Sequence, residues 1–368
     1  MAVYLYQRKE WPYFTWNQEK LATLLATIHH GQGRLLGRME GIGLALQEEA
    51  ALQTLTQDVL KSSEIEGEIL NPDQVRSSIA LRLGIDIAGL VASDRNVDGV
   101  VEMMLDATQK YADPLSEERL FGWHAALFPM GRSGISKIVV GNWRNNRKDD
   151  PMQVVSGPTG REQIHYQAPD AELVADEMNA FIYWFNTENT IDPILKSAIA
   201  HLWFVTIHPF DDGNGRVARA ISDLQLARSE GTAQRFYSMS AQIRKERNGY
   251  YAILEQTQKE SLDITDWLQW FLNCINRALL ATEETLATVI KKAKFWEKQT
   301  GQSLNHRQII LINKLLDGFE GKLNTSKWAK LAKCSTDTAL RDITDLVEKN
   351  ILVKEAAGGR STSYIVNL

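Results

Sequence analysis

Residues 208–219 read His208-Pro209-Phe210-Asp211-Asp212-Gly213-Asn214-Gly215-Arg216-Val217-Ala218-Arg219, and the local architecture follows from them. They bring together one imidazole, two carboxylates, two glycines, one amide and two guanidiniums. Residues 193–207 before this segment and 217–226 after it repeat apolar side chains with a helical period of about 3.6 residues. We therefore expect a tight turn between two helices, ending at the N-terminus of the second.

The second half of the segment predicts an anion site. A helix N-terminus offers unpaired N–H groups and the positive end of the helix dipole. Gly213 and Gly215 allow positive φ and close backbone approach, so that successive N–H groups form a nest, to which Asn214 adds an amide donor. Arg216 and Arg219 are three residues apart and are placed to clamp further phosphates.

The first half adds an acid and a base. Asp212 is a hard oxygen ligand suited to Mg²⁺ held jointly with phosphates. His208 has an ordinary pKa of about 6.5 and is the natural general base. The alternative is a helix cap with surface arginines. A base, an acid, a nest and two arginines occur together within twelve residues. This close spacing favours a magnesium–polyphosphate site with a base beside it.

The same segment resembles the signature of the Fic family, His-x-Phe-x-(Asp/Glu)-Gly-Asn-Gly-Arg-x-x-Arg, at every specified position. The resemblance implies a mainly α Fic-type helical core and a protein adenylyltransferase, which moves AMP from ATP to a Ser, Thr or Tyr hydroxyl of a target protein and releases pyrophosphate. It implies His208 as the base, Asp212 as the Mg²⁺ ligand, and the residues from Gly213 to Arg219 as the phosphate site.

Bulk composition sets outer limits on these expectations. The chain has 368 residues and a net charge of −5, which argues against non-specific nucleic-acid binding by the whole molecule. Its two cysteines, Cys274 and Cys334, suggest neither a disulfide framework nor a metal cluster. Residues 1–11 lack the pattern of a signal peptide, and no stretch is apolar enough to span a bilayer. We therefore expect a cytoplasmic protein with no membrane partner.

Residues 1–112 are predicted to form an N-terminal helical region. Its helix over about 43–63 leads into Ser62-Ser63-Glu64-Ile65-Glu66-Gly67. Ser62 and Glu66 share a helix face, Gly67 supplies a stop, and a carboxylate at a helix C-terminus opposes the dipole. By itself this is a polar last turn. Within the Fic family a (Ser/Thr)-x-x-x-Glu-(Gly/Asn) segment is an inhibitory helix, which implies that Glu66 in segment 62–67 pairs with Arg219 and misplaces the ATP phosphates.

Residues 113–281 are expected to be the catalytic core. Gly and Pro interrupt the helical pattern over 129–169, and two strand-like runs flank Ser156-Gly157-Pro158-Thr159-Gly160, which predicts a hairpin. The resemblance makes this hairpin, about 150–168, a flap that pairs with an extended target segment through Val154, Val155 and Ser156. Arg144 and Arg147, before it, are interpreted as solvent-exposed. We interpret His124 as a partly buried helix residue rather than a ligand.

Residues 238–258 are predicted to form one further helix. Tyr250 and Tyr251 are by default core residues whose hydroxyls find partners. The Fic resemblance instead implies that they border the adenine pocket, with Gln258 near the base.

The C-terminal residues 282–368 are predicted to form a charged connector helix, then three short helices and a hairpin. This order resembles a winged helix. Its third helix has more acidic than basic residues, whereas a major-groove reader needs net positive charge toward phosphates. Protein docking or homodimerisation is therefore favoured over DNA binding.

Two other functions stay open at this point. A de-AMPylase, using a water activated by Glu66, or another phospho-group transferase would use the same site. An ATP-sensing winged-helix transcriptional regulator would use its Fic-like core only to sense ATP, and the intact His208 argues against it, because a sensor has no use for a base.

Overall fold

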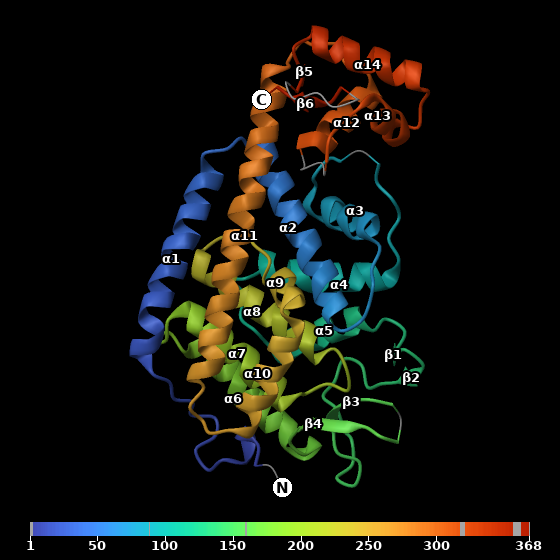
Figure 1. Ribbon diagram of the computed structural model, residues 1–368. Helices are drawn as coiled ribbons and strands as arrows, with labels where there is room; N and C mark the ends of the chain where they lie inside the picture. The colour runs from blue at the N-terminus through green and yellow to red at the C-terminus, as the bar shows by residue number, and fades with distance from the viewer. Residues whose placement is uncertain (1–2, 88, 159, 317–320, 356–361, 368) are drawn as a thin grey trace. The chain divides into compact units, whose positions relative to one another are not determined.

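The computed structural model describes residues 3–87, 89–158, 160–316, 321–355 and 362–367 (Figure 1). It is mainly helical, as predicted. The chain folds as two compact units, Met1–Thr282 and Glu283–Leu368. No described helix is both long and apolar enough to cross a membrane.

Among the described residues, the first unit contains ten complete α-helices and two 3-10 helices, Leu5–Gln7 and Ala171–Leu173, and an eleventh α-helix, α11, continues from it into the second unit. The α-helices are α1 (Gln18–Glu40), α2 (Leu44–Ile65), α3 (Pro72–Leu83), α4 (Arg95–Gln109), α5 (Glu117–Leu127), α6 (Val174–Thr187), α7 (Pro193–Ile207), α8 (Asn214–Glu230), α9 (Met239–Lys245), α10 (Arg247–Lys259) and α11 (Thr265–Lys298).

Helix α8 lies at the middle of this unit and contacts α7, α4, α2 and α5 (Figure 1). Every residue of α7 from Ile194 to Ile207 is buried, because its apolar side chains surround the whole helix. Asp192 caps α7 by accepting the N–H groups of Ile194 and Leu195, and Pro193 occupies its first turn. The core of the unit therefore forms around the two helices that flank residues 208–213.

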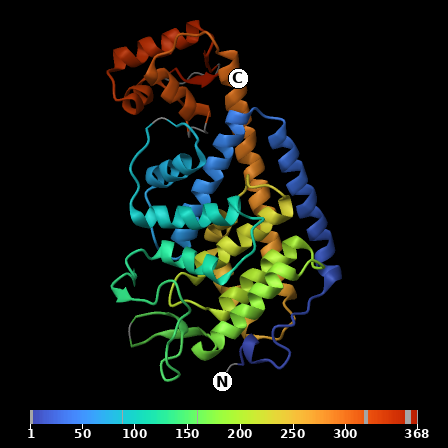
Figure 2. The same ribbon diagram turned by 180° about the vertical axis from the view of Figure 1, so that it is seen from behind.

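Helices α4 and α5 pack side by side, and both contact α8 (Figure 2). Gly99 makes the approach of α4 to α5 possible, since a Cβ there would lie 1.8 Å from the carbonyl oxygen of Ala126. This packing fixes α5, which carries His124.

The β-structure of the described residues of this unit consists of four short strands and one isolated bridge between Thr15 and Asp263. β1 (Arg132–Ser133) pairs with β2 (Ser136–Lys137), and β3 (Gln153–Ser156) pairs antiparallel with β4 (Gln163–Gln167). The β3–β4 register shifts between Val154 and Val155, so a bulge lies in the predicted flap. Aromatic residues of the N-terminal arm pack on the body: Tyr4 contacts Tyr166 edge-on, with ring centroids 5.0 Å apart.

Two helix boundaries differ from the sequence prediction. The charged connector predicted from residue 282 is the C-terminal part of a longer helix, α11, which begins at Thr265, because no Gly or Pro interrupts 265–298. Residues 238–258 instead form two helices, α9 and α10, which break at Glu246.

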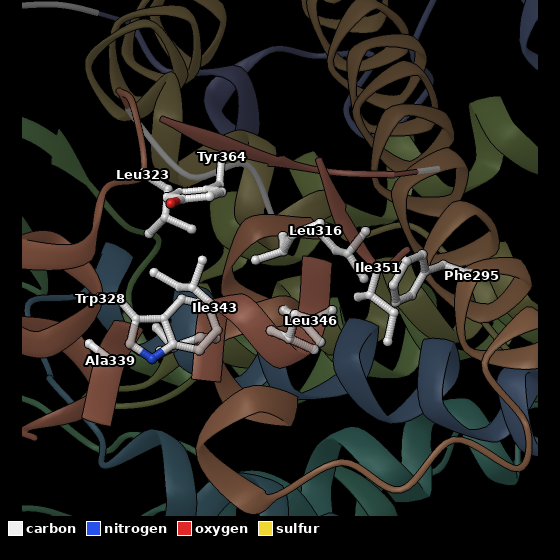
Figure 3. Close-up of a cluster of buried hydrophobic side chains, with 12 residues drawn as sticks. Phe295, Leu316, Leu323, Trp328, Ala339, Ile343, Leu346, Ile351 and Tyr364 are labelled. Atoms are coloured by element: carbon white, nitrogen blue, oxygen red, sulfur yellow. The ribbon is translucent and has the colours of Figure 1, made fainter. Parts of the chain in front are cut away.

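The second unit has three helices followed by a hairpin, the order that the sequence predicted. α12 (His306–Leu316), α13 (Thr325–Ala332) and α14 (Thr336–Glu348) precede β5 (Leu352–Lys354) and β6 (Tyr364–Val366). Figure 3 shows buried side chains from several of these elements facing one apolar interior, including Trp328, Ile343 and Tyr364. On α14, Asp342 is paired with Arg307. The winged-helix interpretation stays a prediction.

Candidate functional site

His208 ends helix α7 in the left-handed conformation, with φ 53° and ψ 58°. Its N–H donates to the carbonyl of Phe204, and its Nδ1 lies 3.2 Å from the carbonyl oxygen of Val205. A carbonyl only accepts, so Nδ1 carries the proton and Nε2 keeps its lone pair. Burial lowers the pKa of His208 to about 4, so the ring is neutral at pH 7. A neutral imidazole with a free Nε2 is suited to accept a proton.

Arg144 binds the backbone around His208 through hydrogen bonds. Its Nε donates to the carbonyl of His208 at 2.8 Å, its Nη2 donates to the carbonyl of Pro169 at 2.5 Å, and its own N–H donates to the carbonyl of Pro209 at 2.9 Å. The side chain is 2% exposed. The prediction that Arg144 is solvent-exposed is therefore wrong, because the guanidinium satisfies buried carbonyls of the loop.

His124 supports the same loop from the other side. Its ring stacks on Phe210 at 4.1 Å with an interplanar angle of 5°, and its Nε2 lies 3.2 Å from the carbonyl oxygen of Asp212. The N–H of Gly141 points at its Nδ1, so Nε2 is the donor to Asp212. His124 is fully buried, which is more than the sequence interpretation expected, and it positions the loop.

Asn214 closes the turn. Its Oδ1 accepts the N–H of Phe210 at 3.0 Å, and its Nδ2 donates to the carbonyl of Phe210 at 2.8 Å. The side chain is buried, so this amide shapes the loop rather than simply extending a donor to a ligand. Its role as an amide donor to a ligand stays a prediction.

The first turn of α8 has unpaired backbone donors. Gly213 precedes α8 with φ 81°, and no hydrogen bond among the described residues uses the N–H groups of Asn214, Gly215 or Arg216. Three donors at the positive end of α8 are thus available to an anion.

Asp212 lies beside these donors. Its Oδ1 accepts the N–H of Gly213 at 2.5 Å, and its Oδ2 accepts the hydroxyl of Ser133. No cluster of three or more metal-ligating side chains occurs among the described residues. A single partly exposed carboxylate beside these donors nevertheless fits Mg²⁺, which takes one or two carboxylates together with phosphate oxygens and water.

Helix α2 meets α8 at Arg219. Nε of Arg219 donates to the Ser62 hydroxyl at 2.9 Å, and Nη2 donates to the Ser62 carbonyl at 2.9 Å and to Oε1 of Glu66 at 2.8 Å. Arg219 is 2% exposed, and its buried Nη1 has no hydrogen-bond partner among the described residues. Gly67 follows the end of α2 with φ 89° and turns the chain away.

Glu66 also covers the start of α8. A Cβ on Gly215 would lie 2.2 Å from Oε1 of Glu66. The carboxylate therefore occupies space directly over the N-terminal turn of α8.

A second ion pair was not predicted from the sequence. Nη1 of Arg216 donates to Oε2 of Glu68 at 2.6 Å, and its guanidinium lies 5.0 Å from the ring centroid of Phe128. Both arginines of the motif therefore face carboxylates that follow α2. A signal was present, since Glu68 lies two residues beyond Glu66.

Tyr250 and Tyr251 lie next to this cluster with different surroundings. Tyr250 is buried, and its hydroxyl lies 2.7 Å from Nε2 of His201. Tyr251 is half-buried, and its hydroxyl donates to Oε2 of Glu66 at 3.4 Å. Burial raises the pKa of both phenols, so both are neutral donors.

Gln258 lies behind His208. It is 5% exposed, and its Nε2 is 3.4 Å from the carbonyl oxygen of Val205, the group that also holds Nδ1 of His208. The side chain is thus part of the packed core in this structure.

The flap is anchored through β4 and has a free outer edge on β3. The Tyr166 hydroxyl donates to the carbonyl of Thr206 at 2.5 Å, and Nδ1 of His165 lies 2.7 Å from Oε2 of Glu255. Val155 is 47% exposed. No other described strand pairs with β3, so Val154, Val155 and Ser156 border an open edge.

Two family models match the chain. Residues 114–226 match the Fic/DOC family, and residues 4–85 match a domain of unknown function, DUF4172. The first match includes the motif 208–219, and the second includes α2 with Ser62 and Glu66.

Similar proteins extend this result. Protein adenylyltransferase Fic of Drosophila mojavensis is 24% identical over 229 residues, which cover 61% of this chain and 40% of that protein. Protein adenylyltransferase fic-1 of Caenorhabditis elegans is 28% identical over 197 residues, which cover 50% and 35%. The chain thus spans less than half the length of these relatives. The crystal structure of a Fic family protein from Desulfovibrio desulfuricans G20 superposes with a TM-score of 0.54 at 20% identity, covering 97% of this chain and 98% of that one.

Proposed function

Because the chain contains a Fic/DOC-family domain, we propose that it is a protein adenylyltransferase that moves AMP from ATP to a hydroxyl of a target protein. The observation that carries the proposal is the position of His208, a neutral base with a free Nε2, one short loop away from the three free N–H groups of α8. The named relatives support the same chemistry.

The reaction is an in-line substitution at the α-phosphorus. Nε2 of His208 accepts the proton of the target hydroxyl as its oxygen attacks the α-phosphorus. The bond from that phosphorus to the oxygen bridging to the β-phosphate breaks, and pyrophosphate leaves. The free N–H groups of α8 stabilise the charge on the α-phosphate, and Arg216 and Arg219 neutralise the departing pyrophosphate.

Asp212 is the residue that would hold Mg²⁺, which neutralises phosphate charge and orients the leaving group when bound. The short contacts of its carboxylate to Ser133 and Gly213 fix its orientation before any ligand arrives.

We further propose that Glu66 inhibits this site. Arg219 would be needed by the γ-phosphate, yet Ser62 and Glu66 already accept hydrogen bonds from its Nε and Nη2. ATP that binds beside this ion pair would place its phosphates away from the line of attack. Removing the Glu66 carboxylate should return Arg219 to the nucleotide.

The open edge of β3 supports a role in target docking. An extended target segment that pairs with Val154, Val155 and Ser156 would gain main-chain hydrogen bonds and present its hydroxyl toward His208. The flap's anchorage to α7 and α10 keeps this edge in place.

The test uses ATP labelled on the α-phosphate or on the γ-phosphate, with the full chain and its Glu66→Gly and His208→Ala variants. Adenylylation transfers only the α-label, first to the protein itself and then to lysate proteins. Transfer of the γ-label would identify a phosphotransferase instead. Loss of AMP from a modified target, followed by mass spectrometry, would identify a de-AMPylase.

A further inference from the structure

An open pocket of about 480 Å³ lies where α9 joins α10. Residues 244–249 and the indole of Trp270 on α11 line it, and it shares no residue with the motif 208–219. Ligand pockets in proteins commonly measure about 300–1,000 Å³, so the volume is sufficient for a small organic molecule.

The lining of this pocket is electropositive. Arg244, Lys245 and Arg247 contribute three cations, and the only carboxylate among the lining residues, Glu246, is already bound by Arg277 through two contacts of 2.5 and 2.6 Å. Lys245 is exposed, and no ion pair in the described part of the chain involves it. An anion entering here would therefore meet a net positive charge.

Trp270 supplies a rigid aromatic wall. Its ring system packs against Trp267, at 5.8 Å and an interplanar angle of 20°, and against Tyr250, at 5.7 Å. The side chain is partly exposed and lines the pocket. The part of the indole that lines the pocket offers an aromatic surface to a planar ring.

The cations of this pocket also hold the end of α2. Nη2 of Arg244 lies 3.0 Å from Oε1 of Glu64, and Nε of Arg247 donates to the carbonyl of Ile65 at 2.7 Å. These two positions immediately precede Glu66. Contacts made by the pocket's arginines therefore help to fix the carboxylate that faces Arg219.

We propose that this pocket is an effector site for an aromatic phosphate of the size of a nucleoside monophosphate. The phosphate binds Arg244, Lys245 and Arg247, and the ring stacks on Trp270. By competing with Glu64 and with the carbonyl of Ile65, the bound phosphate loosens the end of α2 and frees Arg219. The effect on activity rests on the proposed function, whereas binding and loosening do not.

AMP is the probe, titrated by calorimetry into the full chain and into two charge-matched variants. Lys245→Glu places a negative charge in the pocket, and Lys9→Glu makes the same change at an exposed residue of the N-terminal arm. We expect Lys245→Glu to weaken one AMP site at least tenfold and Lys9→Glu to leave it unchanged. Equal binding by both variants would overturn the proposal. Adenosine lacks the phosphate and inorganic phosphate lacks the ring, so each should bind more weakly than AMP. Binding of either as tight as that of AMP would overturn the proposal that the pocket recognises both the phosphate and the ring.

Hydrogen exchange of amides 62–67 reports the loosening without any enzymatic assay. Saturating AMP should accelerate exchange there severalfold in the parent and in Lys9→Glu, and not in Lys245→Glu. Protection of these amides by AMP in the parent would show the opposite coupling and sink the release mechanism. Were AMP-dependent exchange found without any transfer from ATP, the effector site would stand and the adenylyltransferase proposal would fall.

Discussion

Oε1 of Glu66 lies 2.8 Å from Nη2 of Arg219, and the two residues are 153 positions apart in the chain. The contact joins α2, which lies in one family match, to α8, whose N-terminal part lies in the other. The arginine is buried and the carboxylate partly exposed, so the pair is anchored on the side of α8. A ligand for Arg219 must therefore displace α2's end or bind around it.

Glu66→Gly should raise self-adenylylation at least tenfold, because Arg219 is then free to bind the nucleotide. Ser62 still accepts two hydrogen bonds from Arg219, so the cost in unfolding free energy should stay within about 1–3 kcal/mol. Rates from ATP labelled on the α-phosphate, together with urea unfolding, measure both effects.

Glu49→Gln serves as the matched control for this change. Glu49 lies near the N-terminal end of the same helix, α2. Its carboxylate pairs with Arg76 at the surface rather than with Arg219. An equal rise in both variants would mean that α2 is merely destabilised, and would remove the inhibitory role of Glu66.

Arg144→Ala should lower kcat about a hundredfold while changing the Kd for ATP little. The loss of its contacts to the carbonyls of His208 and Pro169 leaves the loop free to move, and small misplacements of a base cost about that much. Rate assays should show the slower transfer, and filter binding should show an unchanged affinity for ATP.

Arg147→Ala is the comparison for that experiment, because Arg147 is exposed and pairs with Asp149 at the surface. It should behave as the parent does. A variant of Arg144 that binds ATP weakly, rather than reacting slowly, would show that the residue serves the nucleotide and not His208.

The rate of transfer should stay level from pH 8 down to about 5. Burial lowers the pKa of His208 to about 4, so the base is still unprotonated at pH values where an ordinary histidine, with a pKa of about 6.5, is charged. A pH profile of kcat/KM tests this expectation, and circular dichroism at each pH shows whether the protein is still folded. An inflection of kcat/KM near pH 6.5 would mean that His208 is more exposed to water than it is in the structure.

Stability should fall as the pH rises through the range above 4, in part through Asp58. Burial and the neighbouring Asp223 raise the pKa of the Asp58 carboxyl. Between the unfolded pKa of about 4 and the raised folded pKa, the folded state holds a proton that the unfolded state has lost, so raising the pH favours unfolding.

Asp58→Asn keeps the acceptor for the Ser238 hydroxyl and removes this proton. The decline in melting temperature between pH 6 and 9 should therefore be shallower in Asp58→Asn than in the parent. Asp86→Asn, at an exposed position, should reproduce the parent's slope. Parallel slopes in all three proteins would mean that Asp58 is ionised in the folded state.

Local patterns predicted much of the fold. The helical period before and after residues 208–213, Pro193, and the two glycines together specify α7, the turn and α8, because those signals act within a few residues. The apolar periods of the C-terminal residues likewise predicted its three helices and hairpin. The boundary at Glu246 and the continuity of α11 were missed, since no strong breaker marks the first or interrupts the second.

The residues of the candidate site, too, were predicted only in part from the sequence. Motif chemistry suggested His208 and the arginines as site residues, and the family resemblance suggested Glu66; these roles stay predictions. Arg144 and His124 were misread or undervalued because their partners are backbone carbonyls 64 and 88 positions away. Carbonyl groups are present at every residue, so no sequence pattern announces which of them a buried side chain will satisfy.

Glu66 and Glu68 pair with Arg219 and Arg216, so ion pairs link the segments of the two family matches. The chain should therefore not be divided between these two matches. A fragment beginning near residue 114 would keep the whole catalytic motif. It would also expose two guanidiniums that are now nearly buried, and uncover the face of α8 against which α2 packs. Truncation would thus mix the loss of the proposed inhibitory contact with the loss of a packing surface of α8. Point substitutions in the intact chain are the cleaner way to separate regulation from folding.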